Sequence, residues 1–222
     1  MKIIDVPQTG KLGLTVTYPS RNGLIRRAWV VPANPQTGSQ LAVRSRLAER
    51  ATAYDALSEA QQDAWVAAAA QEQSRPTLGQ SGPLTGLQLY VKINANLDLV
   101  SEPVVNTPPA KATPDSLIWT ALEITHISNV IAIKLAVSGT SDAFQLVRAA
   151  APQNSGTRRM ATRRYLGELP AISGGKADIT ALYTAKYGVP AVGDRLFVEL
   201  QPMENGWMGV AAMKSALVPA SS

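Results

Sequence analysis

Four prolines lie close together near the middle of this chain of 222 residues, at positions 103, 108, 109 and 114. Proline fixes φ and has no amide hydrogen, so neither a helix interior nor a central strand can run through this segment. Helix-type spacing of apolar residues precedes the prolines, and short strand-type runs follow them. We therefore predict an α+β chain in which a semi-rigid linker, 102–114, joins a module over 1–101 to a β-sheet domain over 115–222.

The N-terminal module begins with two runs of β-branched and apolar residues, 12–18 and 24–31. Asn22-Gly23 lies between them, and an Asn-Gly pair favours a tight β-hairpin turn because both residues tolerate positive φ. Two strands alone are marginally stable in water. We therefore expect this hairpin to pack on another surface.

Three helices are expected after the hairpin. Apolar residues recur at three- and four-residue spacing over 41–54, which indicates an amphipathic helix. Ser58 and Gln61 have the spacing of a capping box at the start of a second helix. Thr85 is placed to cap a third.

The segment after the prolines predicts an antiparallel β-sandwich, because short apolar runs alternate with turn residues and only one short helix, 178–187, is indicated. The expected strands cover 129–137, 143–150, 163–169, 195–201 and 207–218.

This C-terminal half resembles a fibronectin type III or immunoglobulin-like module. The strand Ile131–Leu135 and the closing run Gly193–Val198 carry the likeness. The resemblance implies the variety without a disulfide, because the chain has no cysteine.

The N-terminal part resembles a group of uncharacterised bacterial and phage-related proteins. The likeness lies in Asn34-Pro35-Gln36-Thr37 to Gln40, in Arg44, and in an element containing Leu57, Ser58, Gln61 and Trp65. The group brings no established activity. It implies a structural or binding protein and suggests a component of a virion.

Composition excludes several kinds of chemistry. Without cysteine there is no thiolate metal site, iron–sulfur cluster or cysteine nucleophile, and the single histidine, His126, excludes a multi-histidine zinc site. No phosphate-binding glycine motif or calcium-loop periodicity occurs, so we predict no cofactor. A hydrolase centred on His126 is the least favoured hypothesis, because Glu123 is the only acidic residue nearby in sequence and no Gly-x-Ser-x-Gly motif is present.

The excess of positive charge is local. The net charge is +6 over 1–50, −3 over 51–111 and +4 over 158–164, against +5 for the whole chain. Such segments can form basic contact surfaces. The candidate interaction residues are Arg26, Arg27, Trp29, Arg44, Arg46, Arg50, Arg158, Arg159, Arg163 and Arg164.

The arginines of 158–164 have three interpretations. If the segment is extended, each face carries two guanidinium groups, which suits recognition of carboxylates or phosphates. They could dock on an acidic surface of a neighbouring subunit, or bind nucleic acid. The simplest interpretation is a solvated edge whose charges prevent aggregation.

The basic N-terminal third allows a second hypothesis, a nucleic-acid-binding module in which Arg44, Arg46 and Arg50 contact phosphate. The following helix opposes it, because Glu59 and Asp63 would repel phosphate. Arg46 and Arg50 are also i, i+4 neighbours, an unfavourable pair unless an anion or carboxylate is near.

We therefore expect a non-enzymatic structural protein that acts by self-association or docking. Its partners would be further copies of the chain or other structural subunits of an assembly. No signal peptide or membrane-spanning run is indicated, so the expected history is synthesis in the cytoplasm, without membrane attachment, followed by incorporation into a phage particle.

Overall fold

The computed structural model describes residues 9–20, 23–31, 33–74, 82–128, 130–159 and 162–221. These residues contain four α-helices and three antiparallel sheets, which confirms the mixed α+β class. The chain divides into two compact units, Met1–Ser45 and Arg46–Ser222. This division differs from the prediction, which placed the boundary at 102–114.

The first unit contains a small antiparallel sheet of order β1-β2-β3, formed by Gly10–Leu12, Thr15–Ser20 and Gly23–Ala28. β2 and β3 pair in the region of the expected hairpin, whereas β1 is an additional strand. Part of the expected Asn-Gly turn, Asn22, lies outside the described residues. Thr17 is the one buried side chain among the described residues of this unit, so the sheet has no hydrophobic core of its own.

The helical segments are α1 (Gly38–Asp55), α2 (Glu59–Ala69), α3 (Gly86–Leu97) and the short 3-10 helix η1 (Asp98–Val100).

Reciprocal capping boxes begin α2 and α3. The hydroxyl of Ser58 accepts a hydrogen bond from the backbone amide of Gln61, whose side-chain oxygen accepts one from the amide of Ser58. Thr85 and Gln88 make the same pair of bonds. Each box satisfies amides that have no partner within the first helical turn, so the two helices begin where the sequence specifies.

The helices of the second unit enclose a core around Trp65, which is fully buried together with Leu89, Tyr90 and Ile93. The ring of Tyr90 packs edge-on against Trp65, with 5.3 Å between the ring centroids. These α3 residues recur at three- and four-residue spacing, so one face of α3 is turned into this core.

Residues 102–114, which we call the proline strap, pack against this core. The indole nitrogen of Trp65 donates a hydrogen bond to the carbonyl of Asn106 at 2.9 Å. That of Trp207 donates to the carbonyl of Pro109 at 3.4 Å. Prolines interrupt regular structure, and the carbonyls of this segment are thereby available to accept bonds from side chains. The segment expected to be a semi-rigid linker therefore has specific contacts with both the helices and β11.

Two antiparallel sheets make up the rest of the second unit. One has the order β4-β5-β9-β8, and the other has the order β11-β10-β6-β7, with β12 also paired to β10. Their strands are β4 (Ile118–Ile127), β5 (Val130–Ser138), β6 (Phe144–Ala149), β7 (Arg164–Glu168), β8 (Ile172–Ser173), β9 (Lys176–Asp178), β10 (Arg195–Glu204), β11 (Trp207–Met208) and β12 (Ala212–Leu217).

The two sheets share one hydrophobic core. Ile133 and Leu135 of β5 meet Val147 of β6 and Val198 and Leu200 of β10 in the same cluster, and all five are fully buried. Burial of a side chain of this size contributes about 1.5–3 kcal/mol. The alternation expected from a two-layer sheet structure is therefore present along β5.

α4 (Thr180–Tyr187) precedes β10 and is tied to the end of β6. The hydroxyl groups of Tyr183 and Tyr187 donate hydrogen bonds to the carbonyls of Ala150 and Ala149, at 3.1 and 2.9 Å. Burial raises the pKa of the Tyr183 hydroxyl well above its ordinary value. That hydroxyl therefore stays protonated and acts as a structural donor.

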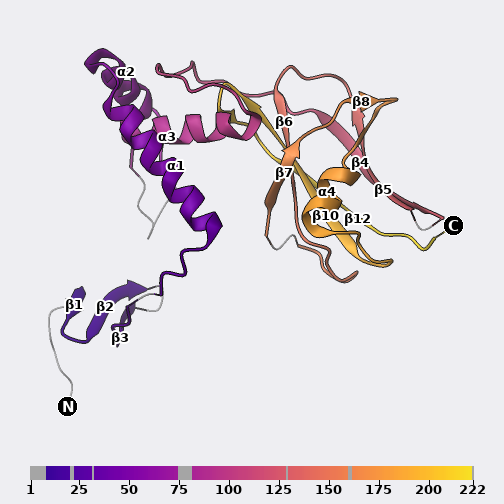
Figure 1. Cartoon of the computed structure of the whole chain (residues 1–222), viewed down its shortest axis with the longest axis horizontal. Coiled ribbons are helices and arrows are strands. Elements are labelled where there is room, and N and C mark those ends of the chain that lie inside the picture. Colours follow the sequence, from indigo (N-terminus) through magenta and orange to yellow (C-terminus); the bar gives the residue numbers. More distant parts are fainter. Residues whose placement is uncertain are drawn as a thin grey trace. The chain divides into compact units, whose positions relative to one another are not determined.

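α3 docks closely on the β10–β11 turn of the sandwich, as Figure 1 shows. Gly206 has a φ of +80°, and a Cβ atom there would lie 2.7 Å from the Cγ2 atom of Ile93. The carbonyl of Gly206 accepts a hydrogen bond from the Asn96 side chain at 2.7 Å. Glycine is needed here both for the positive φ and for the close approach of the helix. No described helix is long and apolar enough to cross a membrane.

Candidate interaction surface

The described part of the first unit exposes large apolar side chains that no core covers. Both hydrophobic clusters of the described chain lie in the second unit. A concentration of exposed apolar side chains on so small a sheet is typical of a contact surface. On the sheet and in the segment that follows it to Val31, the most exposed are Leu14 at 77%, Val30 at 74%, Leu12 at 65%, Val31 at 65% and Leu24 at 50%.

Cations and aromatic rings are paired on the same sheet. The Lys11 ammonium lies 3.5 Å from the ring centroid of Trp29, and the Arg27 guanidinium lies 5.4 Å from that of Tyr18. The strand register places Lys11 and Arg27 on opposite sides of Val16, so both cations share one face of the sheet. We call the exposed apolar and cationic residues of this sheet and of the following segment to Val31 the N-terminal surface.

Among the described residues, the hydrogen bonds of Arg26 and Arg44 are to neutral groups. Arg26 donates to the Thr17 hydroxyl at 3.4 Å, and Arg44 donates to the Asn34 side chain at 3.0 Å. Arg46, the first residue of the second unit, is exposed. Residues 9–48 contain six basic and no acidic side chains, so no carboxylate partner exists within that segment.

Arg50 has an internal role, which differs from its predicted part in an interaction surface. It is 9% exposed, and its guanidinium donates to the Asp98 carboxylate at 2.5 Å. Arg46 and Arg50 are like charges at i, i+4 spacing, a pair that is unfavourable without a nearby anion. The Asp98 carboxylate is such an anion. This pairing cannot be predicted from the sequence, because Arg50 and Asp98 lie 48 positions apart.

The arginines of 158–164 separate into two kinds. Arg158 and Arg159 are exposed in a loop, and Arg164 begins β7. Arg163 instead forms an ion pair with Glu199 of β10, with 2.6 Å between Nη1 and Oε2, and the Glu199 side chain is only 3% exposed. One member of the expected patch therefore compensates a buried charge.

An acidic corner formed by Asp55, Glu59 and Asp63 lies where α1 ends and α2 begins, and all three side chains are exposed. Asp55 ends α1 four positions before Glu59, and Glu59 and Asp63 lie about one helical turn apart on α2. Burial raises the pKa of the Tyr54 hydroxyl, and the charges of Asp55 and Asp63 raise it further. The sequence showed that α2 is acidic, but only the structure brings Asp55 alongside it.

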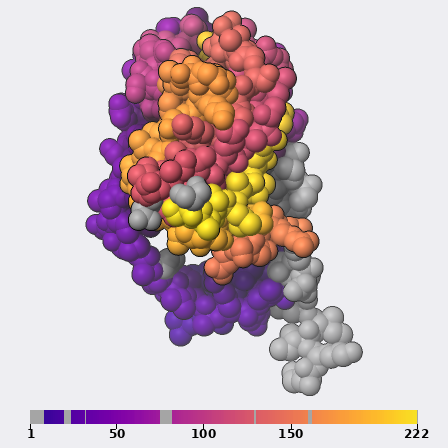
Figure 2. All heavy atoms as spheres, turned by 90° about the vertical axis from the view of Figure 1, so that its right-hand side faces the viewer, coloured from indigo at the N-terminus to yellow at the C-terminus, as the bar shows by residue number. Residues whose placement is uncertain are grey.

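His126 lies on β4 beside the C-terminal segment, with its Nδ1 3.3 Å from the carbonyl oxygen of Pro219. Figure 2 shows the C-terminal atoms (yellow) against those of the β4–β5 hairpin (rose). Glu123, the acidic residue considered as its partner, lies three positions away and therefore on the opposite face of the strand. Glu123 pairs instead with Lys176 at 2.5 Å.

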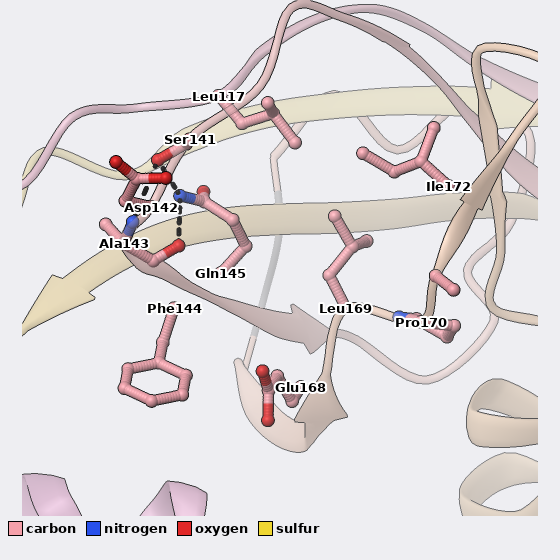
Figure 3. Close-up of a pocket in the computed structure, with 11 residues that line it drawn as sticks. Leu117, Ser141, Asp142, Ala143, Phe144, Gln145, Glu168, Leu169, Pro170 and Ile172 are labelled. Carbon is pink, nitrogen blue, oxygen red and sulfur yellow. Dashed lines mark hydrogen bonds between the residues drawn. The ribbon is translucent and has the colours of Figure 1, made fainter.

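A pocket of about 310 Å³ opens at one end of the sandwich, with Asp142 and Glu168 among its lining residues (Figure 3). Gln145 is nearly buried in its wall, and its amide donates to the Ser141 hydroxyl and to the Ala143 carbonyl. No group of three metal-binding side chains comes together among the described residues.

Comparison of the chain with protein-family models, with curated proteins and with solved structures finds no match. The functional argument therefore depends on the geometry of the chain itself.

Proposed function

We propose that this protein is a non-enzymatic structural protein that acts by self-association or docking through its N-terminal surface. The observation that carries the proposal is the contrast between the two units. The second has two buried hydrophobic clusters, whereas Leu14 and Val30 of the first are about three-quarters exposed. A three-stranded sheet without a core gains stability by covering its apolar side chains on a partner.

In this proposal the second unit is the scaffold, and its sheets form a fibronectin III-like sandwich. If β8 and β9 count as one strand and β11 and β12 as another, the sheets contain seven strands. The first, second and fifth along the chain (β4, β5 and β8–β9) form one sheet. The other four (β6, β7, β10 and β11–β12) form the second sheet. A division of seven strands between two antiparallel sheets is what a sandwich requires, and it supports this part of the proposal.

Size-exclusion chromatography with light scattering tests the proposal on the full chain. We expect oligomers at micromolar concentration, and we expect the double variant Leu14→Ser and Val30→Ser to shift them towards monomer. The matched control is Val189→Ser with Val210→Ser, because these valines are 71% and 84% exposed in the second unit. A wild-type chain that stays monomeric and binds no structural protein of its native assembly would contradict the proposal.

The proposed setting is a phage particle. Its support is the likeness of the Asn34-Pro35-Gln36-Thr37 element to phage-related proteins, together with a surface suited to assembly. A mass-spectrometric inventory of purified particles tests it, and consistent absence of the chain from them would refute this part.

Nucleic-acid binding is the second candidate, favoured by the six basic and no acidic residues of 9–48. It predicts salt-sensitive binding that weakens when Arg44 and Arg46 are replaced by alanine. Unchanged mobility of nucleic acid at low salt would exclude it. Arg50 is left intact in this test because its charge is paired with Asp98 inside the fold.

A further inference from the structure

We propose that the N-terminal surface of one chain docks on the acidic corner of a second copy, so that copies associate head to tail. This inference rests on the proposed function, because it names the occupant of the N-terminal surface.

The charge of the N-terminal surface favours an acidic occupant. Lys11, Arg26 and Arg27 have no carboxylate within 9–48. Symmetric pairing of two β3 edges in antiparallel register would bring arginines of the two copies close together, and like charges across paired strands are unfavourable. The favoured contact therefore joins two different surfaces.

The apolar part of the N-terminal surface favours a protein over a nucleic acid. Leu14 and Val30 are each at least 74% exposed beside the strands that carry the cations, whereas Leu12, also exposed, lies on the face of the sheet opposite to Lys11. Phosphate groups can neutralise the cations, but they leave aliphatic side chains uncovered. A partner surface that combines carboxylates with small apolar side chains covers both.

The acidic corner has that combination. Its three carboxylates form no ion pair with the described residues. Val66 and Ala67 lie three and four positions after Asp63 and therefore on the same side of α2, and Val66 is 54% exposed. The acidic corner thus presents negative charge next to the exposed apolar side chain of Val66.

Helix stability does not account for the whole acidic corner. Glu59 lies in the first turn of α2, where the helix dipole favours a negative charge. Asp55 is the last residue of α1, where the dipole disfavours one. A cationic partner outside the helix would stabilise a carboxylate at that position.

Contact between two different surfaces has a geometric consequence. Each copy offers one donor and one acceptor surface, so association continues until the copies close a ring or extend as a filament. The expected products are rings or filaments larger than a dimer.

Two charge-reversal variants of the full chain test the proposal. The first carries Arg26→Glu and Arg27→Glu, and the second carries Asp55→Lys and Asp63→Lys. By analytical ultracentrifugation, each alone should associate at least about tenfold more weakly than the wild type, since like charges then face each other. An equimolar mixture of the two should regain association, and so should one chain carrying all four changes, because opposite charges again meet.

Matched controls carry the same charge changes elsewhere: Arg158→Glu with Arg159→Glu, and Glu102→Lys with Glu204→Lys. All four residues are exposed, and these variants should associate like the wild type. Circular dichroism reports whether each variant is folded. Asp55→Lys is expected to preserve α1, because a positive charge suits the end of a helix.

The outcomes distinguish this inference from the proposed function. If the wild type associates and the acidic-corner variant associates equally well, the inference is overturned while docking through the N-terminal surface stands. Failure of the mixture and of the four-change chain to recover would also overturn it. Loss of nucleic-acid binding without loss of self-association in the arginine variant would assign the surface to nucleic acid instead. A wild type that remains monomeric with no partner would remove both the inference and the proposed function.

Discussion

Replacing Arg163 with alanine should destabilise the sandwich, whereas replacing Arg158 or Arg159 should have little effect. Arg163 Nη1 lies 2.6 Å from Oε2 of Glu199, whose other carboxylate oxygen is buried with no hydrogen-bond partner in the structure. Without the guanidinium, the Glu199 charge would lose its ion pair and would keep only Arg148, its cross-strand neighbour on β6, as a nearby cation.

The expected loss of stability depends on how exposed the Arg163 and Glu199 side chains are. Breaking a fully buried ion pair costs about 3–5 kcal/mol. The Arg163 side chain is 56% exposed, so solvent already screens one end of the pair and can partly replace the lost bond. We therefore expect a loss of about 2–3 kcal/mol in the free energy of unfolding. For a chain of this length, that lowers Tm by about 4–12 °C.

Thermal denaturation at pH 7 followed by circular dichroism measures the change, with Arg158→Ala and Arg159→Ala as matched controls within about 0.5 kcal/mol of the wild type. Adding Glu199→Gln to Arg163→Ala should recover most of the loss, because the neutral amide has no charge to bury. Equal stability of Arg163→Ala and the controls would refute the reasoning, as would a double variant no more stable than Arg163→Ala.

Three further changes probe the second unit. The hydrogen bond from Lys111 lowers the pKa of Glu72, so the ionised carboxylate stabilises the fold above the ordinary pKa of 4.5 and this stability is lost as the pH falls through the lowered value. Glu72→Gln should cost about 1 kcal/mol at pH 7 and progressively less in acid; a difference independent of pH in urea denaturation would contradict this. Gly206→Ala should cost about 1–3 kcal/mol, because its Cβ would press on Ile93 and the positive φ disfavours alanine; an unchanged Tm would show that α3 does not pack so closely. Ser58→Ala should cost about 1 kcal/mol through the lost helix cap, and Ser58→Gly only a few tenths; equal urea midpoints for the wild type and Ser58→Ala would argue against the capping box.

Features set by short-range chemistry could be predicted from the sequence. The Ser58 capping box needs only residues within one helical turn. The turn after β10 follows from Asn205 and Gly206, which adopt positive φ angles of 49° and 80°. The strands of the sandwich follow from alternating apolar residues between such turns.

Long-range pairing of polar groups could not be predicted in this way. From the sequence alone, Arg50 and Arg163 are expected to be free to bind a partner. Their carboxylate partners, Asp98 and Glu199, lie 48 and 36 positions away along the chain. Proline content suggested an isolated linker because it reports the stiffness of a segment, not the side chains that bind its carbonyls.

The candidate surface was predicted in part. The basic character of the N-terminal third is a property of sequence alone. The absence of a hydrophobic core in the first unit cannot be predicted from sequence alone, because Leu12 and Leu14 follow the same pattern as strands that are buried on one face. The acidic corner depends on where α1 ends and α2 begins, at Asp55 and Glu59.

The proline strap also has a mechanical consequence. It runs from the helices to the sandwich with prolines that resist rotation about φ, and two indole groups fasten it, one from α2 and one from β11. A pulling force on α2 would therefore be transmitted to the sheets through a stiff segment that two indole hydrogen bonds hold in place.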